Sequence, residues 1–189
     1  MNTPAHLLIG AAAGGRKNYP GTTVAALLGS LVPDLSLYVM VAVSIWVMGI
    51  PAETVFRELY YSDAWQAVFA VDNSFIVWSV ALLFFFWRKS LWGIAFCVGG
   101  LLHLVLDFPF HTHDARMHFW PVSTWVFESP ISYWDRNAYA NVVGPVEVLM
   151  AAGATLILIR RGLGIWLTLL FAVLFLMELL SSGIWQFVF

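Results

Sequence analysis

The sequence predicts an all-α integral membrane protein, a bundle of five transmembrane helices plus a short N-terminal half-membrane helix. Composition is the first reason: 61% of the 189 residues are hydrophobic, only 11% are charged, and the mean hydropathy is +0.82. A soluble domain of this size could not bury so much apolar surface. The second reason is that long apolar runs recur at the length of about 20 residues that crosses a bilayer core. Pairs of basic residues separate these runs, which is the third reason.

A single transmembrane domain, residues 1–189, accounts for the chain, because no repeat or linker divides it. The expected helices cover residues 3–14, 24–48, 65–87, 91–108, 142–159 and 163–187. The first is too short to span and turns back through Gly15–Gly21 into the second. Asp72 and Asn73 interrupt the outer end of the 65–87 helix, and Pro109 ends or kinks the 91–108 helix.

Basic residues set the expected orientation. The pairs Arg16–Lys17, Arg88–Lys89 and Arg160–Arg161 hold six of the nine Lys and Arg and fall at alternate ends of consecutive spans. The positive-inside rule therefore places these three turns in the cytoplasm and the 109–141 loop on the outer side of the membrane. The net charge of −2 leaves no basic patch for a nucleic acid, so the lipid bilayer is the expected partner.

Every expected helix brings a polar or charged side chain to one layer between the membrane midplane and the outer leaflet. A rise of about 1.5 Å per residue from the cytoplasmic turns gives these depths. The members of this layer are His6, Asp34, Asp72, His103, Asp107, Glu147 and Glu178. Ionisable groups inside a membrane face the protein interior and are candidates for function. Glu147 and Glu178 could equally be protonated acids that bond to a neighbouring helix.

Residues 103–118 contain four of the five histidines. His103 and Asp107 are four residues apart and share a helix face. The antiparallel turn after the first helix brings His6 beside Asp34. Imidazole and carboxylate ligands suit a divalent metal, with zinc as the first choice and manganese, iron or nickel as alternatives; haem would need facing axial ligands without surrounding carboxylates. The expected ligands are His6, Asp34, His103, Asp107, His111, His113 and His118.

Short motifs of the chain resemble the YdjM-like family of membrane-bound metal-dependent hydrolases over residues 1–123. The motifs are Asn2-Thr-Pro-Ala-His6, Gly29-Ser-Leu-Val-Pro33-Asp34, His103-x-x-x-Asp107 and Trp120-Pro121-Val-Ser123. The resemblance implies a bacterial inner-membrane protein with His6, Asp34, His103 and Asp107 as metal ligands. A more distant similarity is to zinc-dependent phospholipase C enzymes. The family's usual His-Arg…Thr-His segment has no counterpart, because residues 7–102 contain no histidine.

The loop after the histidines is rich in aromatic residues: Phe119, Trp120, Trp125, Phe127, Tyr133, Trp134 and Tyr139. Such residues settle at membrane interfaces, so the loop is either an interfacial belt or a lid that admits an amphiphilic substrate from the outer leaflet. In the second case Arg116 and Arg136 would meet a phosphate or carboxylate head group.

Two classes of function follow. The first is a metal-dependent hydrolase of a lipid or lipid-linked ester or phosphoester, with Asp114 or a histidine such as His113 as general base. The second is a cation or proton transporter, or a non-catalytic membrane protein with a structural metal site. Against transport, the five spans show no duplicated halves, and the polar layer stops near mid-depth.

Overall fold

The computed structural model describes the backbone of residues 1–188 and the side chains of residues 1–181. About 72% of the chain is helical, and the described residues contain no β-strand. The first half contains α1 (Thr3–Gly14), α2 (Pro20–Ala42), η1 (Val43–Val47), α3 (Ala52–Thr54), η2 (Val55–Leu59), α4 (Asp63–Asp72) and α5 (Phe75–Trp87). The second half contains α6 (Leu91–Asp107), η3 (Arg136–Ala138), α7 (Ala140–Arg161) and α8 (Ile165–Val188).

Local sequence signals set several of these boundaries. Pro20 occupies the first turn of α2, where its missing N–H costs nothing. Ser74 and Ser90 cap α5 and α6 by accepting hydrogen bonds from backbone N–H groups of the first turn. Gly162 ends α7 with a φ of 65°, a conformation that glycine adopts without strain. The predicted break at Asp72 and Asn73 is present between α4 and α5.

Helices lie in each of the predicted ranges, with shifted ends, and the 65–87 range is divided between α4 and α5. Residues 49–64, which lie between the expected 24–48 and 65–87 helices, contain α3 and η2. The described part of the chain has three helical segments long and apolar enough to cross a membrane, Pro20–Val47, Asp63–Trp87 and Ala140–Arg161. Leu91–Asp107 and Ile165–Ser181 are apolar but shorter. Residue 189 lies outside the described residues.

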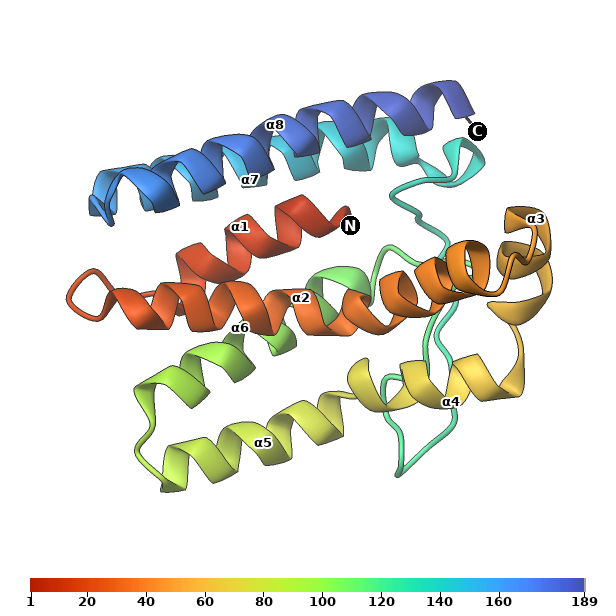
Figure 1. Ribbon diagram of the computed structural model, residues 1–189, viewed down its shortest axis with the longest axis horizontal. Coiled ribbons are helices and arrows are strands. Elements are labelled where there is room, and N and C mark those ends of the chain that lie inside the picture. Colours follow the sequence, from red (N-terminus) through yellow and green to blue (C-terminus); the bar gives the residue numbers. More distant parts are fainter. Residues whose placement is uncertain (189) are drawn as a thin grey trace.

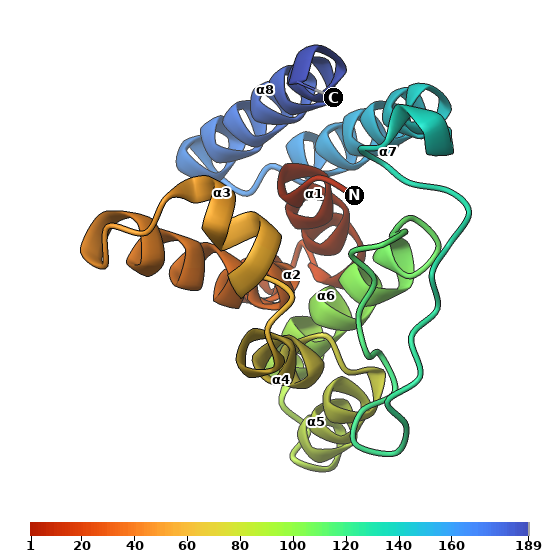
Figure 2. The same ribbon diagram turned by 90° about the vertical axis from the view of Figure 1, so that its right-hand side faces the viewer.

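The short helix α1 lies at the centre of the bundle (Figures 1 and 2), where it packs against α2, α6, α7 and α8. The three turns that carry the basic pairs lie together at the left end of Figure 1, and the chain between α6 and α7 runs along the other end. Large apolar side chains such as Trp46, Leu83 and Leu149 are exposed on the outer faces of the helices. A lipid environment would cover these faces.

Close approach of α1, α2 and α6 depends on small residues at their crossings. A Cβ atom on Gly10 would lie 1.8 Å from Ser30 Oγ, and one on Gly99 would lie 2.1 Å from the Ala26 carbonyl oxygen. Small residues let membrane helices pack backbone against backbone. This packing brings the middle of α1 beside the outer half of α6.

Candidate metal centre

His6, His103 and Asp107 form a buried cluster between α1 and α6. One potential ligand atom from each side chain lies within 4.8 Å of the other two. His6 Nε2 is 2.7 Å from Asp107 Oδ1, and His103 Nε2 is 3.1 Å from Asp107 Oδ2. The two imidazole rings stack with centroids 3.7 Å apart. The structure therefore brings together three of the predicted metal ligands in a group that could hold a metal ion.

A backbone carbonyl fixes the orientation of His103. Its Nδ1 lies 2.7 Å from the Ser30 carbonyl oxygen, which can only accept a hydrogen bond. In the neutral ring the proton is therefore on Nδ1, and Nε2 presents a lone pair. Metal-binding histidines commonly donate their second N–H to a backbone carbonyl in this way.

The environment of His103 Nε2 is rich in negative charge. The atom is buried without a hydrogen-bond partner, 3.1 Å from an oxygen of Asp107 and 3.6 Å from Asp34 Oδ1. A lone pair that faces two carboxylates in a buried site needs a cation or a proton between them. Two imidazoles and one or two carboxylates are suitable ligands for a divalent metal, so the donor set fits the predicted ion.

Asp34 borders the cluster rather than lying inside it. One oxygen faces His103, while Oδ2 accepts a hydrogen bond of 2.5 Å from Thr3 Oγ1. The backbone nitrogen of Met1 also lies 2.5 Å from Asp107 Oδ1. The start of α1 is thus attached to the candidate centre at three points, through Met1, Thr3 and His6.

His111 extends the cluster into the loop. Its Nε2 lies 3.2 Å from Asp107 Oδ2 and its Nδ1 lies 2.8 Å from Asp114 Oδ2, so the ring connects two carboxylates. Trp134 Nε1 donates a further hydrogen bond of 3.1 Å to Asp114. Burial alone would lower the pKa of His111, but the Asp107 and Asp114 carboxylates raise this pKa to about 9.

Two predicted ligands lie elsewhere. The His113 side chain is 79% exposed, and its nearest acidic partner is Glu128, at 3.8 Å. His118 is buried with Nδ1 2.9 Å from the Asn73 carbonyl oxygen, and its ring packs against Phe75 and Phe108. Burial lowers the pKa of His118 to about 4, which keeps the ring neutral. The structure therefore does not bring His113 or His118 to the cluster.

The aromatic loop packs on the outer end of α6 (Figure 2). Phe108 stacks on Phe127 at 5.0 Å, and Phe119 contacts both Phe75 and Phe108. Arg116 is buried with its guanidinium 3.8 Å from the Phe69 ring centroid, so it does not face outward toward a head group. Arg136 is exposed on η3.

The acids of α7 and α8 hold the N-terminal end of α1. Glu147 accepts a hydrogen bond from the Asn2 backbone N–H, and Asn2 Nδ2 lies 3.3 Å from Glu178 Oε1. Both carboxyl groups are buried.

Two contributors to the metal cluster were not predicted from the sequence: the Ser30 carbonyl oxygen and the Met1 nitrogen. Both are backbone atoms, which residue identity does not reveal.

No protein-family model, curated protein or solved structure matches this chain, so its functional interpretation rests on the geometry of the cluster.

Proposed function

We propose that this chain is an integral-membrane, metal-dependent hydrolase that acts on a lipid or lipid-linked ester or phosphoester. The observation that carries the proposal is His103, whose Nδ1 bonds to a backbone carbonyl while its buried Nε2 faces carboxylates of the same cluster. A histidine that only filled space would have no reason to present its lone pair to buried carboxylates.

In this proposal the protein crosses the inner membrane of a bacterium five times. The helices α6 and α8 cross the membrane in addition to the three longer helical segments, and the three basic turns at one end of the bundle face the cytoplasm. The 109–141 loop then faces the periplasm. The short motifs shared with YdjM-like membrane hydrolases support both the location and the reaction class.

His6, His103 and Asp107 would hold the ion, with zinc as the first choice, and Asp34 is placed to complete its coordination. When bound, such an ion supplies Lewis-acid polarisation of a carbonyl or phosphoryl group and activates water near neutral pH. The chain contributes fixed ligand geometry: α6 sets His103 and Asp107 one turn apart, and Ser30 prevents rotation of the His103 ring.

His111 is the proton-transfer group in this proposal. Asp114 bonds to Nδ1 and orients the ring, which leaves Nε2 directed at the cluster beside Asp107. A carboxylate that orients a histidine next to the reacting centre is a recurring arrangement in hydrolases. His113, the other histidine considered for this role, is exposed on the loop and is not part of the proposed mechanism.

Metal content tests the site directly. The wild-type protein, purified in detergent and analysed for bound metals, should retain zinc or another divalent ion, and His103→Ala should lose it. His113→Ala is the matched control, because it removes a histidine from the same segment without touching the cluster. Equal metal content in wild type and His103→Ala would end the proposal.

Turnover separates hydrolysis from transport. Metal-loaded protein in mixed micelles should cleave members of a panel of phospholipids and lipid esters, and His111→Gln should reduce cleavage while keeping the metal. Metal-dependent cation uptake into proteoliposomes without cleavage of any panel member would instead support the transporter alternative.

A further inference from the structure

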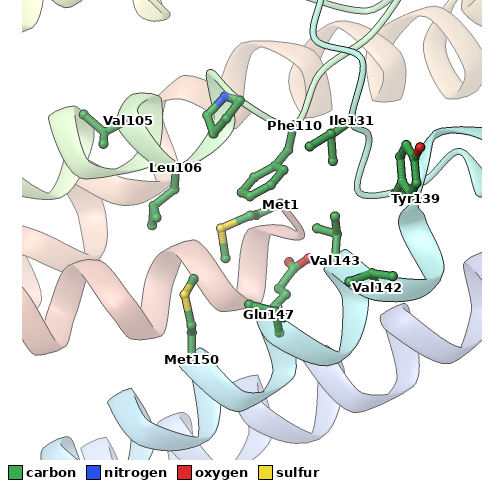
Figure 3. Close-up of a pocket in the computed structure, with 12 residues that line it drawn as sticks. Met1, Val105, Leu106, Phe110, Ile131, Tyr139, Val142, Val143, Glu147 and Met150 are labelled. Atoms are coloured by element: carbon green, nitrogen blue, oxygen red, sulfur yellow. The ribbon is translucent and has the colours of Figure 1, made fainter.

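A cavity of about 580 Å³ opens beside the candidate metal centre, between the outer ends of α6 and α7 (Figure 3). Val105, Leu106 and Phe110 line one side, and Val142, Val146 and Met150 line the other. Ligand sites in proteins commonly have volumes of roughly 300–1,000 Å³. The cavity is therefore large enough for a substantial part of a lipid molecule.

The cavity exists because α1 separates the two helices. α1 packs against both α6 and α7, and it begins in the middle of the bundle. Met1 reaches into the space that remains and forms part of the cavity floor (Figure 3).

The rim of the cavity is apolar and faces the surroundings of the bundle. Val105 is 55% exposed and Val142 is 57% exposed, on opposite sides of the opening. These residues belong to apolar helices, and α7 is long enough to cross a membrane. Hydrocarbon chains of the bilayer would therefore be in contact with the opening.

The floor is different, because it contains a carboxyl group. Glu147 lines the cavity, and Figure 3 shows its carboxyl group directed toward Met1. The side chain is 1% exposed, so only the edge of this group meets the cavity, and the rest of the lining is almost entirely apolar, which favours a hydrocarbon occupant.

The floor also adjoins the metal centre. Met1 lines the cavity while its nitrogen contacts Asp107, and Leu106 is the residue that precedes Asp107 on α6. A molecule in the cavity would thus have its inner end beside the cluster and its outer end in the bilayer. Only an amphiphile with a long hydrocarbon chain matches both ends.

We propose that this cavity binds one acyl chain of a membrane lipid, which enters sideways between α6 and α7 and presents its polar linkage at the Glu147 floor. The bound lipid is a substrate only if the proposed function holds, but its binding in the cavity requires no catalysis. The substrate class it implies is a diacyl or monoacyl lipid rather than a water-soluble ester.

Photolabelling in a bilayer tests the proposal. The protein is placed in phosphatidylglycerol nanodiscs that contain a trace of phosphatidylglycerol with a diazirine in the middle of one acyl chain. Irradiation should label Leu106 or Phe110, which lie inside the cavity, as well as residues on the lipid-facing surface. Peptide mass spectrometry locates the labels.

Two tryptophan substitutions on α7 provide the comparison. Val146→Trp places a large ring at the cavity mouth and should reduce labelling of Leu106 and Phe110 at least several-fold. Leu149→Trp makes a similar change at a residue that is 71% exposed and does not line the cavity, so labelling should not change. Because Val146 is 48% exposed, its replacement by tryptophan does not overfill the core. A metal content equal to that of the wild type verifies that each variant is folded.

Wild-type labelling confined to surface residues, or labelling inside the cavity that Val146→Trp leaves intact, would overturn the inference. Failure of the proposed function looks different. Cavity labelling without cleavage of any lipid would support the acyl-chain site and count against the hydrolase. Cleavage with an unchanged KM in Val146→Trp would support the hydrolase and refute the acyl-chain site.

Discussion

Substitution of Gly99 by alanine should damage the candidate metal centre without changing any of its side chains. Gly99 lies on α6 one turn before His103, at a close approach of α6 to α2. The new Cβ atom would lie 2.1 Å from the Ala26 carbonyl oxygen and 2.9 Å from Ser30 Oγ. Because carbon and oxygen atoms need a separation above about 3 Å, α6 must move away from α2 by roughly 1 Å.

This displacement has two costs that can be worked out separately. Overpacking of a tight contact destabilises by about 1–3 kcal/mol. The same movement would stretch the 2.7 Å contact between His103 Nδ1 and the Ser30 carbonyl beyond hydrogen-bond range. Loss of this bond adds about 1 kcal/mol and frees the ring to rotate. We therefore expect Gly99→Ala to lose on the order of 2–4 kcal/mol of stability and much of its bound metal.

Gly153→Ala is the matched control. Gly153 lies within α7, and a Cβ atom there would have no heavy atom within 4 Å. Alanine in a helix interior is favoured over glycine by up to about 1 kcal/mol, so this variant should be as stable as wild type or more stable. The two substitutions add the same methyl group in opposite environments.

Thermal unfolding in detergent can be followed with a thiol-reactive fluorophore, because Cys97 is the single cysteine and is fully buried. Its thiol should react only as the bundle opens. Elemental analysis of the same samples gives metal content. If Gly99→Ala matched Gly153→Ala in both unfolding temperature and metal content, the close packing of α2 on α6 would not be what positions His103.

Two further predictions concern the ends of the bundle. Arg161 donates hydrogen bonds to the Ala11 and Ala12 carbonyl oxygens at the end of α1. Arg161→Ala should therefore lower the free energy of unfolding by about 1–3 kcal/mol. Arg160→Ala, at an exposed neighbouring residue, should have little effect on the unfolding temperature. The proposed topology predicts that Glu128→Cys, at a side chain that is 64% exposed, reacts with a membrane-impermeant thiol reagent from the periplasmic side and that Lys17→Cys does not. Labelling with the opposite sidedness would reverse the orientation.

The helices could be predicted well because the signals were local. Apolar runs of sufficient length, a proline at Pro109 and basic pairs at the turns each act over a few residues, and the corresponding helices are present. The region from Ala52 to Leu59 was harder to predict. Its helical turns α3 and η2 are short and lie in a sequence with few of the capping residues that mark helix ends.

The cluster was partly predictable for the same reason. His103 and Asp107 lie on one helix, and their spacing fixes their relation before any tertiary contact is known. His6 needed the additional inference that α1 turns back on α2. In both cases regular helical geometry converts sequence separation into distance.

The loop histidines show the limit of this reasoning. His111, His113 and His118 look equivalent in sequence, but only His111 contacts Asp107. In an irregular segment, the direction of each side chain depends on contacts with distant residues, here Asp114 with Trp134 and His118 with Asn73. No periodicity in the sequence distinguishes the three rings.

The position of α1 connects the candidate metal centre and the cavity. His6 of α1 meets Asp107 at the end of α6, and the cavity lies between α6 and α7 with Met1 in its lining. Asn2 secures this arrangement by bonding to Glu147 and Glu178, the two buried acids of α7 and α8. Polar side chains of α6, α7 and α8 therefore converge on the first residues of α1 and fix the position of His6 relative to Asp107.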